Sequence, residues 1–327
     1  MLTRRSFLKT GAVVAAAGVA MPAVIGRARA ASTDMTIGYI ADFPNSSILA
    51  IAEDQKMWEA EGVNATTKVF TNGPIQIQAM GAGSLDFGTI GPGALWLPAS
   101  GRAKVVSVND IGFSDRVIAQ PDITSIEQLK GKKVGVPQGT SGDMILRLAL
   151  KKAGMTIKDI DMVPMDPSTV VAAFASKQIV AAGIWYPLIS VIKKQVPKLN
   201  ELAANKDFFP ETSFINTLVA RNEVVAQDPE KVKKFLSVMK KALDWRINNL
   251  DKAIDLTVAF TNAPKDIVAN VAHSRKMLTS AELEKYTKDG TVDHWLQQFN
   301  DMFVTFGQLK SPEPPKKIYT ADLFLSA

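Results

Sequence analysis

The chain has 327 residues, of which 46% are hydrophobic, which is enough to bury the cores of two domains. It has no cysteine, so disulfides, thiolate metal sites and cysteine nucleophiles are excluded. The net charge of +6 arises mainly in the first thirty residues, which hold five basic and no acidic residues and leave 33 basic against 32 acidic residues elsewhere. This balance argues against a nucleic-acid partner, because phosphate binding needs a clustered basic excess.

The N-terminus has the pattern of an export signal. The motif Thr3-Arg4-Arg5-Ser6-Phe7-Leu8-Lys9 precedes an uncharged stretch at 10–26, which is shorter than the roughly 20 residues of a comfortable membrane span. Ala28-Arg29-Ala30 then supplies small residues at the cleavage positions. We therefore expect residues 1–30 to be a twin-arginine (Tat) signal peptide, cleaved after Ala30 following export by the Tat machinery to the periplasm. The alternative is an N-terminal membrane anchor.

The first part of the mature chain alternates apolar strands with helices. Ser46 or Ser47 is the expected N-cap of the first helix, and Gly62 follows its end. The pattern predicts strands at 35–40, 65–70, 85–90 and 104–108, and helices at 46–61 and 74–82.

The same alternation continues until about residue 184 and then gives way to helices. The pattern predicts strands at 132–136, 161–164 and 179–184. It also predicts one helix that ends at 152 and another at 169–176. Helices follow at 229–249, 250–260, 265–275, 280–289 and 291–305, and 311–315 is a loop. This order predicts an α/β fold with mostly parallel sheets and a helical C-terminal region.

One helix–strand unit occurs twice. Residues 79–92 and 173–186 each read as a helix end, a tight polar break, a strand of small residues and a loop, at an offset of 94 residues. We expect one such unit in each of two similar lobes, the alternative being a chance similarity.

The loop Gly139-Thr140-Ser141-Gly142-Asp143 lies between a predicted strand and helix. Parallel sheets bind ligands beyond the carboxyl ends of their strands, and a helix N-terminus favours an anion by roughly 0.3–1 kcal/mol. The two hydroxyls would face such a ligand. A plain N-cap is the alternative. The loop is not a P-loop, because no Gly-Lys-[Ser/Thr] follows, and its glycine spacing does not fit a nucleophile elbow.

Three further loops follow predicted strands. Trp185-Tyr186-Pro187 offers aromatic walls, Gly91-Pro92-Gly93 offers backbone donors, and Phe43-Pro44-Asn45-Ser46 offers an aromatic ring, an amide and a hydroxyl. Core aromatics, a tight turn and a helix entry are the respective structural alternatives.

The sequence gives little support for catalysis. Its two histidines, His273 and His294, lie in the helical region without a metal-ligand spacing, so we expect no metal, no cofactor and no enzyme activity. The basic run at 231–241 is interpreted as a solvated helix face.

Several segments together resemble a known family. They are Ile37-Gly38-Tyr39, Leu85-Asp86-Phe87-Gly88, the stretch from Leu129-Lys130-Gly131 through Gly139-Thr140-Ser141 to Gly154, Leu218-Val219-Ala220-Arg221, and Pro229-Glu230-Lys231 through Leu236. In this order they resemble the aliphatic-sulfonate, taurine and nitrate substrate-binding proteins of ABC importers.

The resemblance implies a type II periplasmic-binding-protein fold, with two Rossmann-like lobes joined by a two-strand hinge. The strands that cross between the lobes are expected near 116–121 and 217–221. Lobe I would hold residues 33–117 and 221–327, and lobe II residues 118–220. Closure about the hinge would bury the ligand, and the closed form, expected to be a monomer, would dock on an ABC permease in the inner membrane.

The resemblance also carries over site residues. Thr140, Ser141, Gly91, Pro92, Trp185 and Asn45 match ligand contacts of the family. Val180 and Asn216 stand where relatives often carry carboxylates. Because an amide does not neutralise an ammonium, Asn216 favours a small anion, such as an unsubstituted sulfonate or nitrate, over taurine. The full predicted site is Phe43, Asn45, Ser46, Gly91, Pro92, Gly139, Thr140, Ser141, Trp185 and Asn216.

Two other functions use the same fold. The first is a receptor for a thiamine-type pyrimidine or another neutral heterocycle, which Trp185 and Tyr186 could stack against. The second is a pyrimidine-precursor synthase of thiamine biosynthesis. That enzyme depends on histidine and a cysteine-rich segment, and this chain has two histidines, no cysteine and an export signal.

Overall fold

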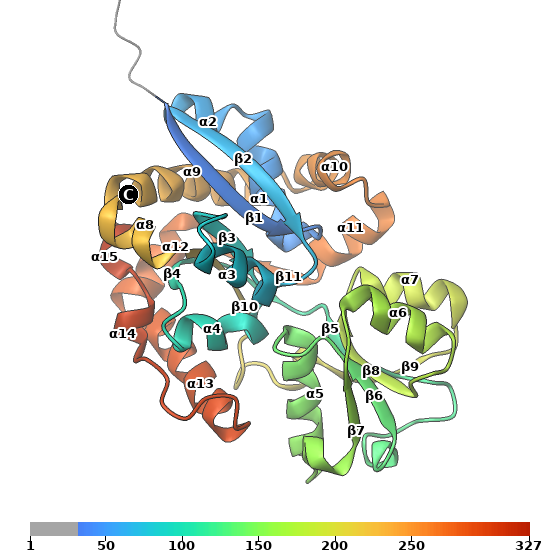
Figure 1. The fold of residues 1–327 in the computed structure, drawn as a ribbon. Helices are drawn as coiled ribbons and strands as arrows, with labels where there is room; N and C mark the ends of the chain where they lie inside the picture. The colour runs from blue at the N-terminus through green and yellow to red at the C-terminus, as the bar shows by residue number, and fades with distance from the viewer. Residues whose placement is uncertain (1–31) are drawn as a thin grey trace, which may run out of the picture. The chain divides into compact units, whose positions relative to one another are not determined.

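Two β-sheets with helices packed on them organise the chain in the computed structural model, which describes residues 32–327 (Figure 1). The expected signal peptide and its cleavage site after Ala30 lie outside the described residues. Within 32–327, no helix has the length and apolar character needed to cross a membrane.

The first sheet has six strands in the order β11-β4-β10-β3-β1-β2. β1 pairs in parallel with β2 and β3, whereas β10 runs antiparallel between β3 and β4. The strands are β1 (Thr33–Ile40), β2 (Val63–Phe70), β3 (Phe87–Ile90), β4 (Lys104–Gly112), β10 (Ile215–Ala220) and β11 (Arg275–Met277).

The second sheet has five strands in the order β7-β6-β8-β5-β9. β6 pairs in parallel with β7 and β8, and β5 runs antiparallel between β8 and β9. The strands are β5 (Asp115–Ala119), β6 (Lys133–Val136), β7 (Asp161–Pro164), β8 (Ala181–Trp185) and β9 (Asn200–Ala204). Apart from edge strand β11, the two sheets have the same strand order. The architecture confirms the predicted α/β fold class. The strands of the repeated helix–strand unit, β3 and β8, occupy matching positions in the two sheets.

The chain passes between the sheets at 113–114 and again at 205–214. Residues 116–119 and 217–220, expected near the crossings, instead lie inside β5 and β10. The crossings lie outside these strands because each strand continues its antiparallel ladder within one sheet.

Helices cover both sheets, and the C-terminal helices lie with the first sheet (Figure 1). The helices are α1 (Phe43–Asp54), α2 (Met57–Ala60), α3 (Gly73–Gly81), α4 (Trp96–Ala99), α5 (Ser141–Lys152), α6 (Pro167–Ala175), α7 (Leu188–Gln195), α8 (Asn222–Gln227), α9 (Pro229–Asn248), α10 (Leu250–Thr261), α11 (Lys265–His273), α12 (Ser280–Lys288), α13 (Thr291–Thr305), α14 (Pro315–Ile318) and α15 (Ala321–Leu325).

The first helix begins earlier than predicted. Asp42, not Ser46 or Ser47, is its N-cap, and the Asp42 carboxylate accepts the backbone N–H of Asn45. Pro44 in the first turn favours this start, since its fixed φ suits the beginning of a helix. Phe43, Asn45 and Ser46 therefore lie in the first turn of α1 and not in a preceding loop.

The helix predicted at 265–275 ends at His273, and Arg275 begins the short strand β11. Arg275 pairs with Gly112 of β4, and its side chain is buried against Asp110 of the same strand. This long-range ion pair replaces the last helical turn that the local pattern predicted.

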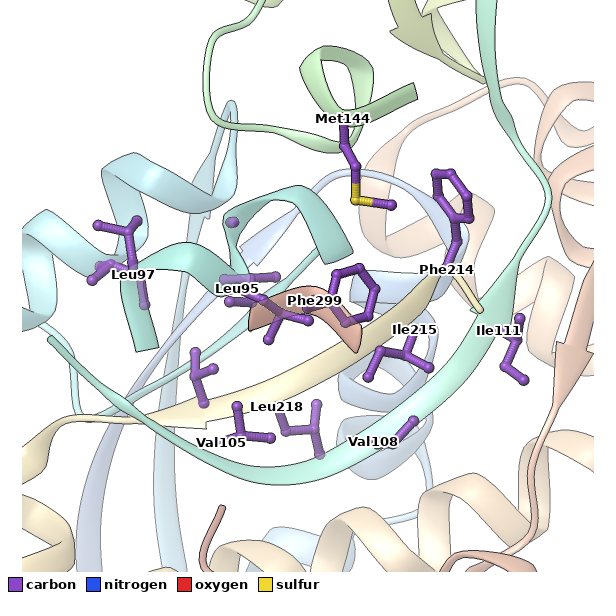
Figure 2. Packing of buried hydrophobic residues seen from close by; sticks show 14 of the residues in the cluster. Leu95, Leu97, Val105, Val108, Ile111, Met144, Phe214, Ile215, Leu218 and Phe299 are labelled. Atoms are coloured by element: carbon purple, nitrogen blue, oxygen red, sulfur yellow. The ribbon is translucent and has the colours of Figure 1, made fainter. Parts of the chain in front are cut away.

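Hydrophobic packing joins the sheets to their helices. Figure 2 shows Val105 and Leu218, from β4 and β10, gathered beneath Leu95 and Phe299. Met144 of α5 belongs to the same cluster, and its side chain extends from that helix toward this group. A separate cluster, which includes Phe174 and Trp185, lies against the second sheet.

The start of α5 packs directly on β8, backbone against backbone. A Cβ added to Gly142 would lie 2.4 Å from the carbonyl oxygen of Gly183, and one added to Gly183 would lie 2.2 Å from the carbonyl oxygen of Gly142. Both positions therefore require glycine, which explains the small residues that the sequence shows in this strand and loop.

Candidate ligand-binding site

A polar pocket lies where the strand ends of the two sheets meet. Its empty volume is about 460 Å³, part of it open to solvent. Seven of the ten predicted site residues line it: Asn45, Gly91, Pro92, Thr140, Ser141, Trp185 and Asn216. They come from both sheets, so the loops singled out by their position after a strand do converge on one pocket.

The other three predicted residues are not among the pocket lining. Phe43 is buried under the guanidinium of Arg246, whose central carbon lies 5.9 Å from the ring centroid. The Ser46 hydroxyl donates to the carbonyl of Asp42. The carbonyl of Gly139 accepts the Trp96 Nε1–H at 3.3 Å. Of the three, Ser46 thus contacts a residue of the pocket lining, Asp42.

The loop before α5 satisfies much of its own hydrogen bonding. The Thr140 hydroxyl donates to the carbonyl of Pro137 at 2.6 Å, so it turns back into the loop and not out toward a ligand as predicted. The Asp143 carboxylate accepts the Gly139 N–H at 2.9 Å and the Arg147 Nε–H at 2.6 Å. Ser141 is left facing the pocket, beside Asp115.

The loops of the two sheets touch through their backbones. A Cβ added to Gly93 would lie 2.0 Å from the carbonyl carbon and oxygen of Thr140. Arg147 of α5 also donates from Nη1 to the carbonyl of Phe306 at 3.3 Å. The pocket is therefore bounded on this side by direct contact between the two sheets' loops.

Asp115, at the start of β5, is a buried carboxylate in the pocket wall that the sequence did not reveal. Its Oδ2 accepts the Nδ2–H of Asn205 at 2.8 Å, and its backbone N–H donates to Oδ1 of Asn205 at 2.6 Å. Its own Oδ1 has no hydrogen-bond partner of ordinary geometry among residues 32–327. Burial raises the pKa of Asp115, against the opposing effects of Ser141, Asn205 and Arg275.

Asp42 and Asn45 form a second polar pair in the wall. Oδ1 of Asp42 accepts both the backbone N–H of Asn45 at 3.0 Å and its Nδ2–H at 2.7 Å. Because this contact orients the amide, Oδ1 of Asn45 points away from Asp42, and it too lacks a partner within the described part of the chain. Burial raises the pKa of Asp42 to about 7.

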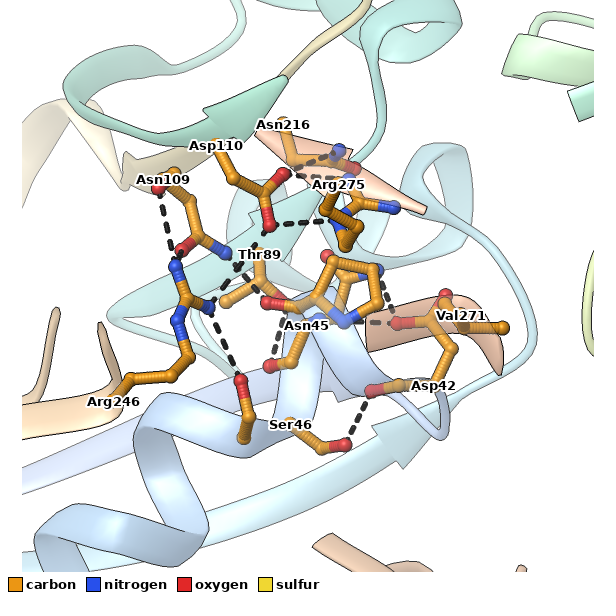
Figure 3. Close-up of polar contacts among 12 residues, drawn as sticks. Asp42, Asn45, Ser46, Thr89, Asn109, Asp110, Asn216, Arg246, Val271 and Arg275 are labelled. Carbon is orange, nitrogen blue, oxygen red and sulfur yellow. Dashed lines mark hydrogen bonds and ion pairs between the residues drawn. The ribbon is translucent and has the colours of Figure 1, made fainter. Parts of the chain in front are cut away.

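Arg275 supplies the positive charge of the pocket wall, and Asp110 engages it in a bidentate pair (Figure 3). The Nε–H donates to Oδ2 of Asp110 at 2.7 Å and Nη2–H to Oδ1 at 2.5 Å. Burial opposes the charge of Arg275, but Asp110, Asp42 and Asp115 outweigh it and raise the pKa of the guanidinium. The charge is thus already neutralised inside the protein.

A second arginine lies behind this pair. Arg246 Nη1 lies 3.9 Å from Oδ2 of Asp110, and its guanidinium donates to Ser47 and Asn109 (Figure 3). Burial lowers its pKa to about 10. Asp110 is therefore held between two buried arginines.

The amide of Asn216 lies beside a carboxylate, that of Asp110. Its Nδ2–H donates to Oδ1 of Asp110 at 3.0 Å. The amide at 216 therefore does not by itself exclude an ammonium ligand, and the preference for a small anion over taurine stays a prediction. Within residues 32–327, no three potential metal-ligating side chains are grouped as a metal site would require.

Comparisons with known proteins give the relatives of this chain. The family described as NMT1/THI5 like matches residues 43–253, and the twin-arginine translocation pathway signal sequence matches residues 1–21. The chain is 55% identical over 323 residues, 99% of each chain, to a Brucella abortus protein whose name says only that it is a binding protein. It is 28% identical over 230 residues to the aliphatic sulfonates-binding protein of Bacillus subtilis, covering 68% of this chain and 67% of that one.

The fold is also found among solved structures. The periplasmic aliphatic sulphonate binding protein SsuA from Escherichia coli matches with a TM-score of 0.66 at 19% identity, covering 89% of this chain and 99% of that one. This protein thus has the type II periplasmic-binding-protein fold. The signal match and the binding-protein relatives show export to the periplasm by the twin-arginine route.

Proposed function

This chain belongs to the NMT1/THI5-like family, and we propose from that premise that it is the periplasmic receptor of an ABC importer, which binds a small ligand rich in N–H donors. The lobe bounds expected from the sequence, 33–117 with 221–327 and 118–220, would split β5 and assign β10 to the wrong sheet. We therefore take lobe I as 33–112 with 215–327 and lobe II as 115–204, which would close on the ligand about the crossings at 113–114 and 205–214. The receptor would act as a monomer, without catalysis, and would present its closed form to the permease in the inner membrane.

Two oxygens carry this proposal; neither has a hydrogen-bond partner of ordinary geometry among residues 32–327, although the Ser141 side chain lies beside Asp115. Oδ1 of Asp115 and Oδ1 of Asn45 both belong to pocket-lining residues, and both are buried acceptors. A buried acceptor without a partner costs about 1–3 kcal/mol, so a ligand N–H that reaches it gains correspondingly. A sulfonate or nitrate offers only acceptor oxygens and would place them against these two.

The charges of the pocket wall also favour a ligand with N–H donors. Asp42 and Asp115 line the pocket, and the single arginine in the lining, Arg275, is already paired with Asp110. A bare anion would meet a neutralised arginine and two further carboxyls. An amine, an amidine or an amino-substituted nitrogen heterocycle would instead donate to them, and a positively charged one would also favour the ionised form of Asp42, whose pKa burial raises to about 7.

An aromatic heterocycle has one further contact. Trp185 is buried at the end of β8 and lines the pocket, where its ring offers a stacking face. This observation favours a ring of the thiamine-type pyrimidine class within the broader group of N–H donors.

A small anion is the second candidate, and the end of α5 favours it. Ser141 lies at the first helical position and lines the pocket, so its hydroxyl and the helix N-terminus could bind a sulfonate or nitrate. The name of the Bacillus subtilis relative supports the same class.

Isothermal titration of the mature protein separates the two candidates. The probes are 4-aminopyrimidine and n-propylamine on one side, and propane-1-sulfonate and nitrate on the other. We expect binding of at least one N–H donor and none of the anions. Binding of the anions alone would overturn the proposal and establish the second candidate.

A thermal-shift screen gives an independent readout. A ligand at about 100 times its Kd stabilises a folded protein by roughly 2.7 kcal/mol, which moves the melting temperature measurably. The double variant Thr140→Ala with Ser141→Ala is the matched test of the anion candidate. It should weaken anion binding at least tenfold if the α5 end holds the ligand, and leave 4-aminopyrimidine binding within twofold if Asp115 and Asn45 do.

A further inference from the structure

We propose that the ligand carries an apolar extension, and that this extension lies in an apolar groove beside the polar pocket. This inference rests on the proposed function for the nature of the head group. The groove is lined by Val69, Phe70, Pro167, Pro187 and Leu188, among others. It shares Ile40, Asp42 and Trp185 with the polar pocket.

The walls of the groove have a chemistry opposite to that of the pocket. Aliphatic and aromatic side chains form most of the groove, whereas carboxylates, amides and an arginine form much of the pocket. Val69 is 62% exposed, one of five large hydrophobic side chains exposed within residues 32–327. Apolar surface of this kind gains about 25 cal/mol per Å² when a ligand covers it.

Both sheets contribute to the groove at matching places. Val69 and Phe70 end β2 in the first sheet, and Pro187 and Leu188 follow β8 in the second. An extension lying between them contacts both lobes at once. It would therefore add to the free energy of closure as well as to binding.

The residues that line both the pocket and the groove indicate what occupies the groove. Trp185 and Asp42 stand on the boundary, so a substituent on a head group that donates to Asp115 or Asn45 leaves the pocket past them and enters the groove. A tail on the ligand would occupy the groove without a second protein chain. The groove has an empty volume of about 690 Å³, partly open to solvent. The ligand class is thus a polar nitrogen-bearing head joined to an aliphatic or aromatic tail.

Two homologous series test the groove whichever head group binds. One series is 4-aminopyrimidine with 5-alkyl substituents from methyl to pentyl, and the other is linear 1-alkanesulfonates from ethane to hexane. Titration calorimetry on the mature protein gives Kd for each member. We expect Kd to fall about twofold to fourfold with each added methylene in the series whose head binds, the upper figure being that of a fully buried methylene.

The variant Val69→Ser with Leu188→Ser tests the location. Neither side chain is fully buried, so the fold should be retained. We expect the dependence of Kd on chain length to disappear, while Kd for the shortest members stays within twofold of wild type. Val191→Ser is the control, because Val191 is 41% exposed on α7 and is not among the residues that line the groove or the pocket.

The outcomes distinguish the groove from the head group. If 4-aminopyrimidine binds but chain length has no effect, the groove proposal is overturned and the proposed function stands. If only the sulfonates bind and their Kd falls with chain length, the groove is supported and the N–H head is overturned. Persistence of the chain-length effect in the double variant, or no binding by either series, overturns the groove.

Discussion

Asn205 and Asp115, which are 90 residues apart in the chain, exchange two hydrogen bonds. Oδ1 of Asn205 accepts the Asp115 N–H at 2.6 Å, and its Nδ2–H donates to Oδ2 of Asp115 at 2.8 Å. Asp115 directly follows the crossing at 113–114, and Asn205 is the first residue of the crossing at 205–214. The carboxylate that faces the pocket is thus oriented by the connection about which the lobes would move.

The first prediction concerns the Asp115 carboxylate. Asp115→Asn replaces one acceptor oxygen by an N–H₂ group of the same shape, so we expect Kd for 4-aminopyrimidine to rise at least tenfold. Because burial already disfavours the charge of Asp115, the variant should unfold at the same or a higher urea concentration than wild type. Titration calorimetry and urea unfolding measure the two effects.

Two companion variants sharpen this test. Asn205→Ala leaves the carboxylate in place but removes the partner that orients it, so Kd should rise by a smaller factor. Asp161→Asn, at an exposed position of β7, should change nothing. Unchanged affinity in Asp115→Asn would remove this carboxylate from the ligand contacts.

The second prediction concerns the buried charges behind the pocket. Asp110→Asn leaves Arg275 and Arg246 without their carboxylate, and breaking a buried pair in this way costs about 3–5 kcal/mol. Urea unfolding should show that loss. Arg275 also becomes available to a ligand, so propane-1-sulfonate should bind the variant more tightly than wild type. Stability equal to that of wild type would contradict the importance of this pair.

The third prediction concerns contact between the loops of the two lobes. Gly93→Ala places a methyl group 2.0 Å from the backbone of Thr140, so this contact between the loops cannot form unchanged. Ligand affinity should fall at least tenfold, while each lobe keeps its fold and the circular dichroism spectrum is retained. Gly81→Ala is the matched control, since a Cβ there meets nothing within 4 Å. Equal affinities of the two variants would show that this contact is not needed for binding.

The fourth prediction concerns pH. Burial raises the pKa of Asp42 to about 7, above the ordinary value of 3.8 that we take for the unfolded chain. The folded state therefore holds a proton that the unfolded state has released, and the stability this provides is complete below about pH 4 and is lost as pH rises through about 7.

Asp42→Asn isolates this effect and preserves a side chain able to cap α1. Urea unfolding at several pH values should show the stability of wild type falling relative to the variant by on the order of 1 kcal/mol per pH unit between about 5 and 7, then levelling. A constant difference across this range would mean that Asp42 stays ionised in the folded protein.

Much of the fold could be predicted from the sequence because its signals are local. Strands such as β3 (Phe87–Ile90) and β6 (Lys133–Val136) are short runs rich in apolar residues and end at a turn. The alternation of such strands with helices predicts parallel sheets, and with them the sheet edge at which the loops converge. For this reason the sequence alone predicts Gly91, Ser141 and Trp185 as site residues, and all three line the pocket.

The carboxylates and the arginine could not be predicted, because their roles depend on pairings across the fold. Arg275 is 165 residues from Asp110, and local periodicity assigned it to a helix, whereas pairing with β4 draws it into a strand. Asp115 depends in the same way on Asn205. Asp42 directly precedes the predicted Phe43–Ser46 loop, but the local pattern predicts Ser46 or Ser47 as the helix cap, whereas the structure has Asp42 there.

The close approach of Gly142 to Gly183 has a consequence for how this receptor could change its ligand. The spacing between the helix end that bears Ser141 and the strand end that bears Trp185 is set by main-chain atoms, which all amino acids share. Exchanges at Ser141 and Trp185 would therefore alter selectivity on an unchanged frame. A side chain at Gly142 or Gly183 would instead push α5 and β8 apart. A library of variants built for new specificities should therefore vary Ser141 and Trp185 and keep both glycines.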